Sequence, residues 1–115
     1  SKCDILSIHI HYNKDNHEII NNSWFDKMRK NVVIINTSRG EVINENHLIN
    51  FIKKNKHVKY STDVVSNETE YKKNKLIKLA KNNKQIFITP HIGGMTYEAR
   101  NFAYTQAANK LIKFF

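Results

Sequence analysis

The 115-residue sequence has one proline, one cysteine and three glycines. With a single cysteine, Cys3, it cannot form an internal disulfide, which fits a reducing compartment such as the cytoplasm. No apolar run approaches the roughly 20 residues that cross a bilayer, and no signal peptide is visible. Because the glycines stand only at positions 40, 93 and 94, the GxGxxG turn of dinucleotide sites cannot be written.

The composition is that of a soluble globular protein, with 40% hydrophobic and 25% charged residues. The chain has the size of one domain or part of one, and its start at Ser1 without a methionine suggests a cut piece or an incomplete sequence. The net charge of +9 could attract a polyanion, but the lysines are scattered through asparagine- and isoleucine-rich segments. We therefore expect neither a nucleic-acid nor a membrane partner, and keep a basic nucleic-acid-binding module as the weaker alternative.

Short β-favouring segments alternate with helical patterns along the whole chain. The predicted strands are residues 4–10, 32–36, 58–65 and 86–89. The predicted helices are residues 23–30 with Ser23 as N-cap, 44–56, 70–80 and 96–115. This order predicts an α/β fold, a partial Rossmann-like domain with a parallel sheet of about four strands. The nearly continuous apolar run at 32–36 predicts a sheet covered by helices on both faces.

The most informative segment is residues 86–94, Ile-Phe-Ile-Thr-Pro-His-Ile-Gly-Gly. It contains the single proline and two of the three glycines. A strand stopped by Pro90 places His91 at the carboxyl end of the sheet, where open α/β sheets hold ligands. Gly93 and Gly94 would let the backbone approach a ligand or adopt a positive φ.

Arg39, Glu68 and His91 each follow a predicted strand, so a parallel sheet brings all three to one edge. Each alone has an ordinary explanation as a loop residue. Together they suit acid–base chemistry on a carboxylate-bearing alcohol or ketone. Arginine grips a carboxylate with two bonds, and a carboxylate beside a histidine stabilises its imidazolium form for proton exchange.

The motifs Asn-Thr-Ser-Arg-Gly at 36–40 and Thr-Pro-His-Ile-Gly-Gly at 89–94 resemble those of the D-isomer specific 2-hydroxyacid dehydrogenases. Ser7 to Ile10 and Thr62-Asp63-Val64 with Glu68 extend the resemblance, in the family's order and spacing, over essentially the whole chain.

The resemblance implies hydride transfer between a nicotinamide cofactor, NAD or NADP, and a 2-hydroxy or 2-keto acid. Its implied catalytic residues are Arg39 for the substrate carboxylate, His91 as acid and base, and Glu68 as the partner of His91. The implied cofactor contacts are His9, Ile10, His11, Asn36, Thr37, Ser38, Arg39, Asp63, His91, Gly93 and Gly94, and the implied assembly is a homodimer.

The resemblance has departures, because the family usually has proline where His11 and Thr69 stand and Lys-Pro-Gly where residues 29–31 stand. Residues 1–115 would then be only the second half of a dinucleotide-binding domain, without the glycine-rich half and the substrate domain. We expect the chain alone to be inactive and to bind NAD poorly. A non-catalytic NAD-binding or regulatory protein of the same fold is the main alternative.

Other polar and aromatic residues invite functional readings that we do not favour. His9 and His11 alternate and could share a metal, but no matching ligand spacing accompanies them, so we assign no metal site. Tyr97, Phe102 and Tyr104 recur at helical spacing, which is more typical of packing than of a binding stripe.

Overall fold

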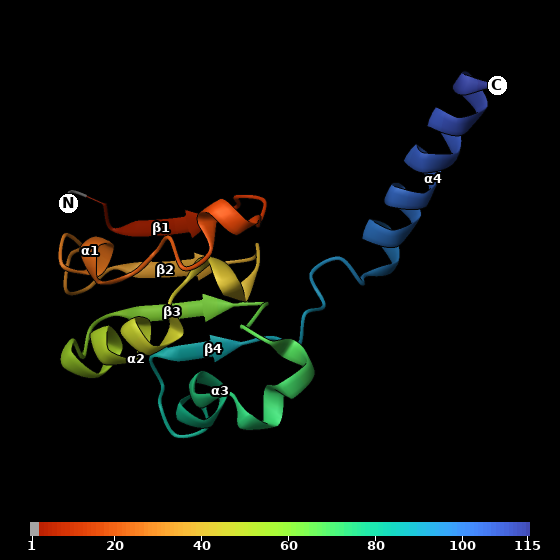
Figure 1. The fold of residues 1–115 in the computed structure, drawn as a ribbon. Coiled ribbons are helices and arrows are strands. Elements are labelled where there is room, and N and C mark those ends of the chain that lie inside the picture. Colours follow the sequence, from red (N-terminus) through yellow and green to blue (C-terminus); the bar gives the residue numbers. More distant parts are fainter. Residues whose placement is uncertain (1–2) are drawn as a thin grey trace.

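The computed structural model describes residues 3–115, which contain a four-stranded parallel sheet in the order β1-β2-β3-β4. The strands are β1 Ile5–Ile8, β2 Val33–Asn36, β3 Lys59–Thr62 and β4 Ile86–Ile88. The α-helices are α1 Asn22–Phe25, α2 Glu45–Lys54, α3 Lys75–Ala80 and α4 Tyr97–Phe114. All four strands point the same way, so their carboxyl ends share one edge (Figure 1). The predicted α/β class with a parallel sheet is confirmed.

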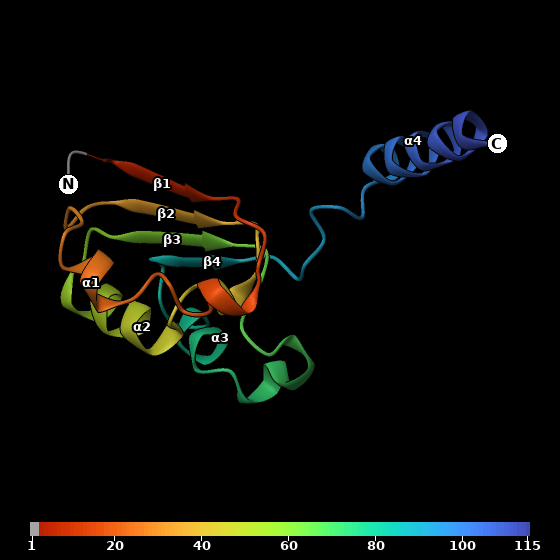
Figure 2. The same cartoon turned by 45° about the horizontal axis from the view of Figure 1, so that its top comes forward.

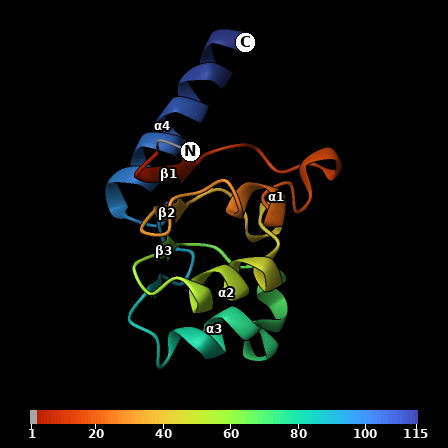
Figure 3. The same cartoon turned by 90° about the vertical axis from the view of Figure 1, so that its left-hand side faces the viewer.

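The helices α1, α2 and α3 lie on the same face of the sheet (Figures 2 and 3). On the opposite face Ile5 is 60% exposed and Phe87 is 65% exposed. The prediction of helices on both faces is therefore wrong for this chain. In β2 only Ile34 and Asn36 are buried, whereas Val33 and Ile35 on the other face remain half-buried.

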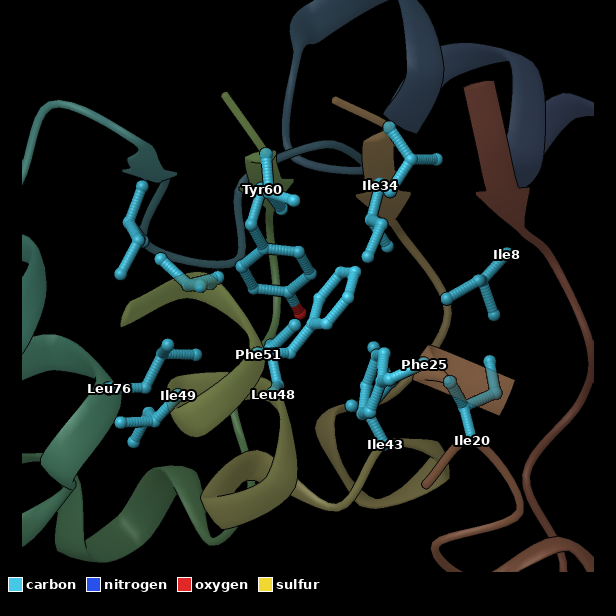
Figure 4. Packing of buried hydrophobic residues seen from close by; sticks show 14 of the residues in the cluster. Ile8, Ile20, Phe25, Ile34, Ile43, Leu48, Ile49, Phe51, Tyr60 and Leu76 are labelled. Carbon is cyan, nitrogen blue, oxygen red and sulfur yellow. The ribbon is translucent and has the colours of Figure 1, made fainter. Parts of the chain in front are cut away.

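The hydrophobic core lies between the covered face of the sheet and α1 to α3. Ile34 and Tyr60 from neighbouring strands point into the same cluster as Phe51 of α2 (Figure 4). The ring of Phe25 in α1 stacks on Phe51 with 5.1 Å between ring centroids. Leu48 and Ile52 have no exposed surface. This packing of α2 fixes the sheet edge from which the strand-end loops emerge.

The first helix differs from the sequence prediction at both ends. Its N-cap is Asn21, whose side chain accepts a hydrogen bond from the Ser23 backbone N–H at 3.1 Å. The prediction of Ser23 as N-cap is wrong, because Asn21 has the extended backbone that a cap requires. The helix ends at Phe25, well before Arg29 and Lys30.

The predicted helix at 70–80 is divided in two. Residues Glu68–Lys73 form a 3-10 helix, and Asn74 then leaves helical geometry and caps α3 by accepting from the Ile77 N–H at 3.0 Å. The predicted strand at 58–65 ends early, at Thr62, because its hydroxyl binds the Val64 N–H at 3.1 Å and turns the chain.

Helix α4 extends away from the sheet (Figure 1), and its predicted start at the cap Thr96 is confirmed. Except for half-buried Ala99, every residue of α4 is exposed. The exposed fractions of Tyr97, Phe102 and Tyr104 are 78%, 69% and 64%, so the prediction that they pack is wrong within this chain. No helix among residues 3–115 is long and apolar enough to cross a membrane.

Candidate active site

The loop after β2 presents Arg39 at the carboxyl edge of the sheet. Asn36 closes this loop with its buried amide, which accepts from the Ser38 N–H at 3.0 Å and donates to the Arg39 carbonyl at 2.9 Å. The exposed Arg39 guanidinium donates to the carbonyl of its neighbour Ser38 at 2.7 Å. Arg39 is thus accessible, and its own loop holds the side chain.

Gly40 lies directly against the loop after β3. A Cβ at this position would stand 2.0 Å from the Val65 carbonyl carbon and 2.1 Å from the Ser66 nitrogen, distances that no side chain permits. Glu41 and Glu45 secure the same contact by accepting from the backbone N–H groups of Asn67 at 3.0 Å and Ser66 at 2.7 Å. The loop that carries Arg39 is therefore joined to the loop that leads to Glu68.

Glu68 and His91 are brought together as the sequence predicts. The Nδ1 atom of His91 lies 2.7 Å from Oε2 of Glu68, and both side chains are partly exposed. A carboxylate at this atom accepts a hydrogen bond from Nδ1–H, which leaves Nε2 as the ring atom that can exchange a proton with a ligand.

The turn from Thr89 to Gly93 gives His91 an unusual backbone. His91 has a φ of 54°, in the left-handed region that L residues rarely adopt, whereas neither Gly93 nor Gly94 has a positive φ. Of the two alternative roles expected for these glycines, a positive φ and the approach of a ligand to the backbone, the positive φ is therefore wrong. Gly93 instead serves close approach, since a Cβ there would stand 3.0 Å from Oδ2 of Asp63.

Asp63 binds this turn with both carboxylate oxygens. Oδ1 accepts from the Thr89 hydroxyl and from the Ile92 N–H at 3.0 Å, and Oδ2 accepts from the Gly93 N–H at 2.8 Å. Partial burial, the largest influence, raises the pKa of Asp63, but these hydrogen bonds and the nearby His91 outweigh it and hold that pKa below its usual value.

The pKa of Glu45 is shifted in the opposite direction from that of Asp63. Burial raises the pKa of its carboxyl group above the ordinary value, although hydrogen bonds from Ser66 and Asn74 act the other way. Asn74 also donates to the Ser66 carbonyl at 3.2 Å, so the Glu45 carboxylate lies in a small polar cluster that anchors the loop before Glu68.

The residues expected to contact a cofactor divide into two groups. His9, Ile10, His11 and Thr37 are exposed at the sheet edge, and the Thr37 hydroxyl lies 3.3 Å from Nδ1 of His9. Asn36 and Ser38 are buried, and the Ser38 hydroxyl donates to the Ile10 carbonyl. The side chains of both residues therefore form hydrogen bonds to loop backbone atoms. Among residues 3–115, no cluster of three or more His, Cys, Asp or Glu side chains could hold a metal ion.

A groove of about 710 Å³ adjoins the His91–Glu68 pair along β4. Its lining is mostly apolar and includes Ile77, Phe87 and Ile88, together with Asp63. Arg39 does not contribute to it. The structure thus places Glu68, His91 and Asp63 in one cluster and puts Arg39 on the loop beside it.

Sequence reasoning missed the residues that hold this arrangement. Gly40, Glu41, Glu45 and Thr89 position the loops through contacts with segments distant in the chain, and nothing in the local sequence of the last three indicates such contacts. A partial signal was available at Gly40, because a glycine immediately after a strand-end arginine favours a close approach of two backbones.

Comparison with known proteins identifies the family. Residues 1–93 match the family model described as D-isomer specific 2-hydroxyacid dehydrogenase, NAD binding domain. The chain belongs to the D-isomer specific 2-hydroxyacid dehydrogenase family. The resemblance noted in the motifs at 36–40 and 89–94 is thereby confirmed.

Individual dehydrogenases and reductases agree with this assignment. The chain is 34% identical over 111 residues to a glyoxylate reductase of Thermococcus litoralis. The matched region covers 96% of the chain and 32% of that reductase. It resembles the crystal structure of a glyoxylate reductase from Paecilomyes thermophila with a TM-score of 0.81 and 30% identity, covering 96% of the chain and 32% of that protein.

A structure of D-lactate dehydrogenase from Aquifex aeolicus, complexed with NAD and lactic acid, is also similar. Its TM-score is 0.78 at 26% identity, over 96% of the chain and 37% of that protein. The chain therefore spans about a third of the length of these dehydrogenases and reductases.

Proposed function

We propose that this chain is the acid–base part of an oxidoreductase that interconverts a 2-hydroxy acid and a 2-keto acid. The observation that carries the proposal is the 2.7 Å contact between His91 Nδ1 and Glu68, at the sheet edge where Arg39 is also presented. Family membership supports it, since the relatives include glyoxylate reductases.

Each of the three residues has a distinct role in this proposal. Arg39 binds the substrate carboxylate through its planar guanidinium and orients the reacting oxygen. His91 donates a proton from Nε2 to the carbonyl oxygen during reduction and takes it back during oxidation. Glu68 accepts a hydrogen bond from Nδ1–H and so orients the ring, as a carboxylate does for a catalytic histidine.

A nicotinamide cofactor fits the exposed part of the sheet edge. His9, Ile10, His11 and Thr37 are accessible there, and Gly94 has no atom within 4 Å of where a Cβ would stand, so a ligand can approach its backbone. When bound, NAD or NADP supplies or accepts the hydride. This chain supplies orientation and proton transfer.

We also propose that residues 1–115 form the second half of a dinucleotide-binding domain. The chain covers about a third of its relatives and has no GxGxxG sequence for the cofactor phosphates. Binding of NAD and turnover would therefore require the rest of a longer protein. By resemblance, we propose that this protein is a cytoplasmic homodimer.

The test uses the whole protein that contains this chain, with NADH and a panel of 2-keto acids. We expect reduction of at least one of them, and a loss of about 10² to 10⁴ in kcat/KM for His91→Ala. Arg39→Ala should mainly raise KM for the keto acid. The controls are His57→Ala and Arg29→Ala, because both residues are exposed and precede strands, away from the carboxyl edge.

The alternatives give different results in the same experiments. A regulatory protein of this fold would bind NADH but turn over no member of the panel. A nucleic-acid-binding module would bind DNA or RNA with an affinity that falls steeply as salt is added. Near-normal turnover of the His91→Ala protein would contradict the assignment of roles.

A further inference from the structure

We propose that Asp63 is a positioning residue that holds the Thr89–Gly93 turn in the one conformation that keeps the His91 ring against Glu68. The inference rests on the proposed function, because it assigns His91 the proton transfer. It gives Asp63 a task within the protein, beyond the cofactor contact that family resemblance implies.

Three hydrogen bonds connect Asp63 to both sides of His91. The Thr89 hydroxyl donates to Oδ1 before the histidine, and the backbone N–H groups of Ile92 and Gly93 donate to Oδ1 and Oδ2 after it, at 3.0 and 2.8 Å. The carboxylate therefore fixes the path of the chain as it enters and as it leaves His91. Charge-assisted bonds of this kind are stronger than those between neutral groups.

The backbone of His91 needs such a restraint. Its φ of 54° is one that a residue with a Cβ adopts only where the surrounding structure holds it. The single local bond across the turn runs from the His91 N–H to the Thr89 carbonyl at 3.0 Å. Without Asp63, the turn can relax to a negative φ, which rotates the direction of the His91 side chain.

Asp63 is itself held in place by the sheet. Asp63 directly follows β3, and its own N–H donates to the Asn36 carbonyl of β2 at 3.1 Å. Thr62, the preceding residue, is buried and also bonds that carbonyl, at 3.0 Å. The turn with His91 is thus tied to the centre of the sheet.

Positioning of this kind has a kinetic consequence. The Nδ1 atom of His91 reaches Glu68 at 2.7 Å only while the ring keeps its direction, and the same direction aims Nε2 at a substrate. Loss of the anchor should therefore lower kcat even when substrate and NADH are saturating, because misplacement by 1 Å can cost about 100-fold in rate.

The experiment compares Asp63→Ala and Asp63→Asn with the control Asp26→Ala, an exposed aspartate after α1, in the whole protein. Two quantities are measured: hydrogen exchange of the peptide 89–93 by mass spectrometry, and kcat at saturating NADH together with the Kd of NADH. We expect Asp63→Ala to speed exchange and to lower kcat at saturating NADH by about 100-fold. Asp63→Asn keeps Oδ1 and should retain part of both properties.

Several results would overturn the inference. Unchanged exchange in peptide 89–93 would show that Asp63 does not hold the turn, and a raised Kd for NADH with unchanged kcat would show a cofactor contact only. If Asp63→Ala fails to fold, Thr89→Val removes one of the three bonds and should give a smaller change in exchange and kcat. If the wild-type protein reduces no 2-keto acid, the proposed function fails, and exchange alone still decides whether Asp63 holds the turn.

Discussion

His91 and Glu68 stand 23 residues apart in the sequence, yet the ring nitrogen Nδ1 and the carboxylate lie 2.7 Å from each other. The replacement Glu68→Gln keeps an acceptor for this bond but removes its charge. We expect kcat to fall about 10- to 100-fold, because a hydrogen bond to a charged group contributes about 1.5–3 kcal/mol.

The matched control for this substitution is Glu70→Gln. Glu70 lies in the same 3-10 helix, but it binds Lys73 at 2.5 Å and Asn67 at 3.0 Å instead of a histidine. Its replacement should leave kcat unchanged. Equal effects of the two substitutions would contradict a specific role for Glu68.

Gly40 should tolerate no side chain. The replacement Gly40→Ala places a Cβ within 2.1 Å of the Val65–Ser66 peptide, so the two loops must separate. We expect a loss of about 1–3 kcal/mol or more in the free energy of unfolding, measured by urea denaturation. Wild-type stability in this variant would show that the two backbones do not make the close contact described here.

Gly93 and Gly94 form a matched pair of adjacent positions. A Cβ at Gly93 would press on Oδ2 of Asp63 at 3.0 Å, whereas a Cβ at Gly94 would meet nothing within 4 Å. We therefore expect Gly93→Ala to speed hydrogen exchange of the 89–93 peptide and Gly94→Ala to leave it unchanged. The reverse order, or no difference, would argue against the contact between Asp63 and Gly93.

Glu45 should make stability depend on pH. Because burial raises the pKa of its carboxyl group in the folded state, ionisation of this group costs folding free energy above the folded pKa. That cost disappears as pH falls through the folded pKa toward the ordinary value of 4.5. The stability of Glu45→Gln relative to wild type should therefore rise as pH increases from about 4.5 to 7.

Urea denaturation of both proteins at several pH values measures this difference. The comparison cancels the contributions of other titrating groups, including Asp63, whose lowered pKa acts in the opposite direction. A difference that is constant with pH would contradict the raised pKa of Glu45.

The sequence predicted the elements that depend on local pattern. The alternation of β-favouring and helical segments predicted the parallel sheet. Asn44 and Thr96 were placed correctly at helix starts, since each side chain accepts a hydrogen bond from a backbone N–H of the first turn. The approach of Glu68 and His91 to one sheet edge was predicted from the strand ends, and their pairing was implied by the family resemblance.

The features that the sequence did not predict depend on contacts made across the fold. Asn21 and Asn74 compete as caps with nearby residues, and only the backbone conformation decides between them. The positive φ lies at His91 rather than at a glycine, in a turn that Asp63 contacts from the loop after β3, and local sequence does not indicate that contact. The second sheet face has no covering helix among residues 3–115 (Figures 2 and 3), and the apolar run at 32–36 does not reveal this.

That uncovered face makes the chain difficult to handle by itself. β1 is an outer strand of the sheet, and Ile5 and Phe87 expose apolar surface on the face without helices. An outer strand offers unpaired backbone groups to other chains, and apolar surface beside it favours aggregation. We expect the 115 residues produced alone to aggregate at high concentration, and production within the longer protein proposed above to prevent it.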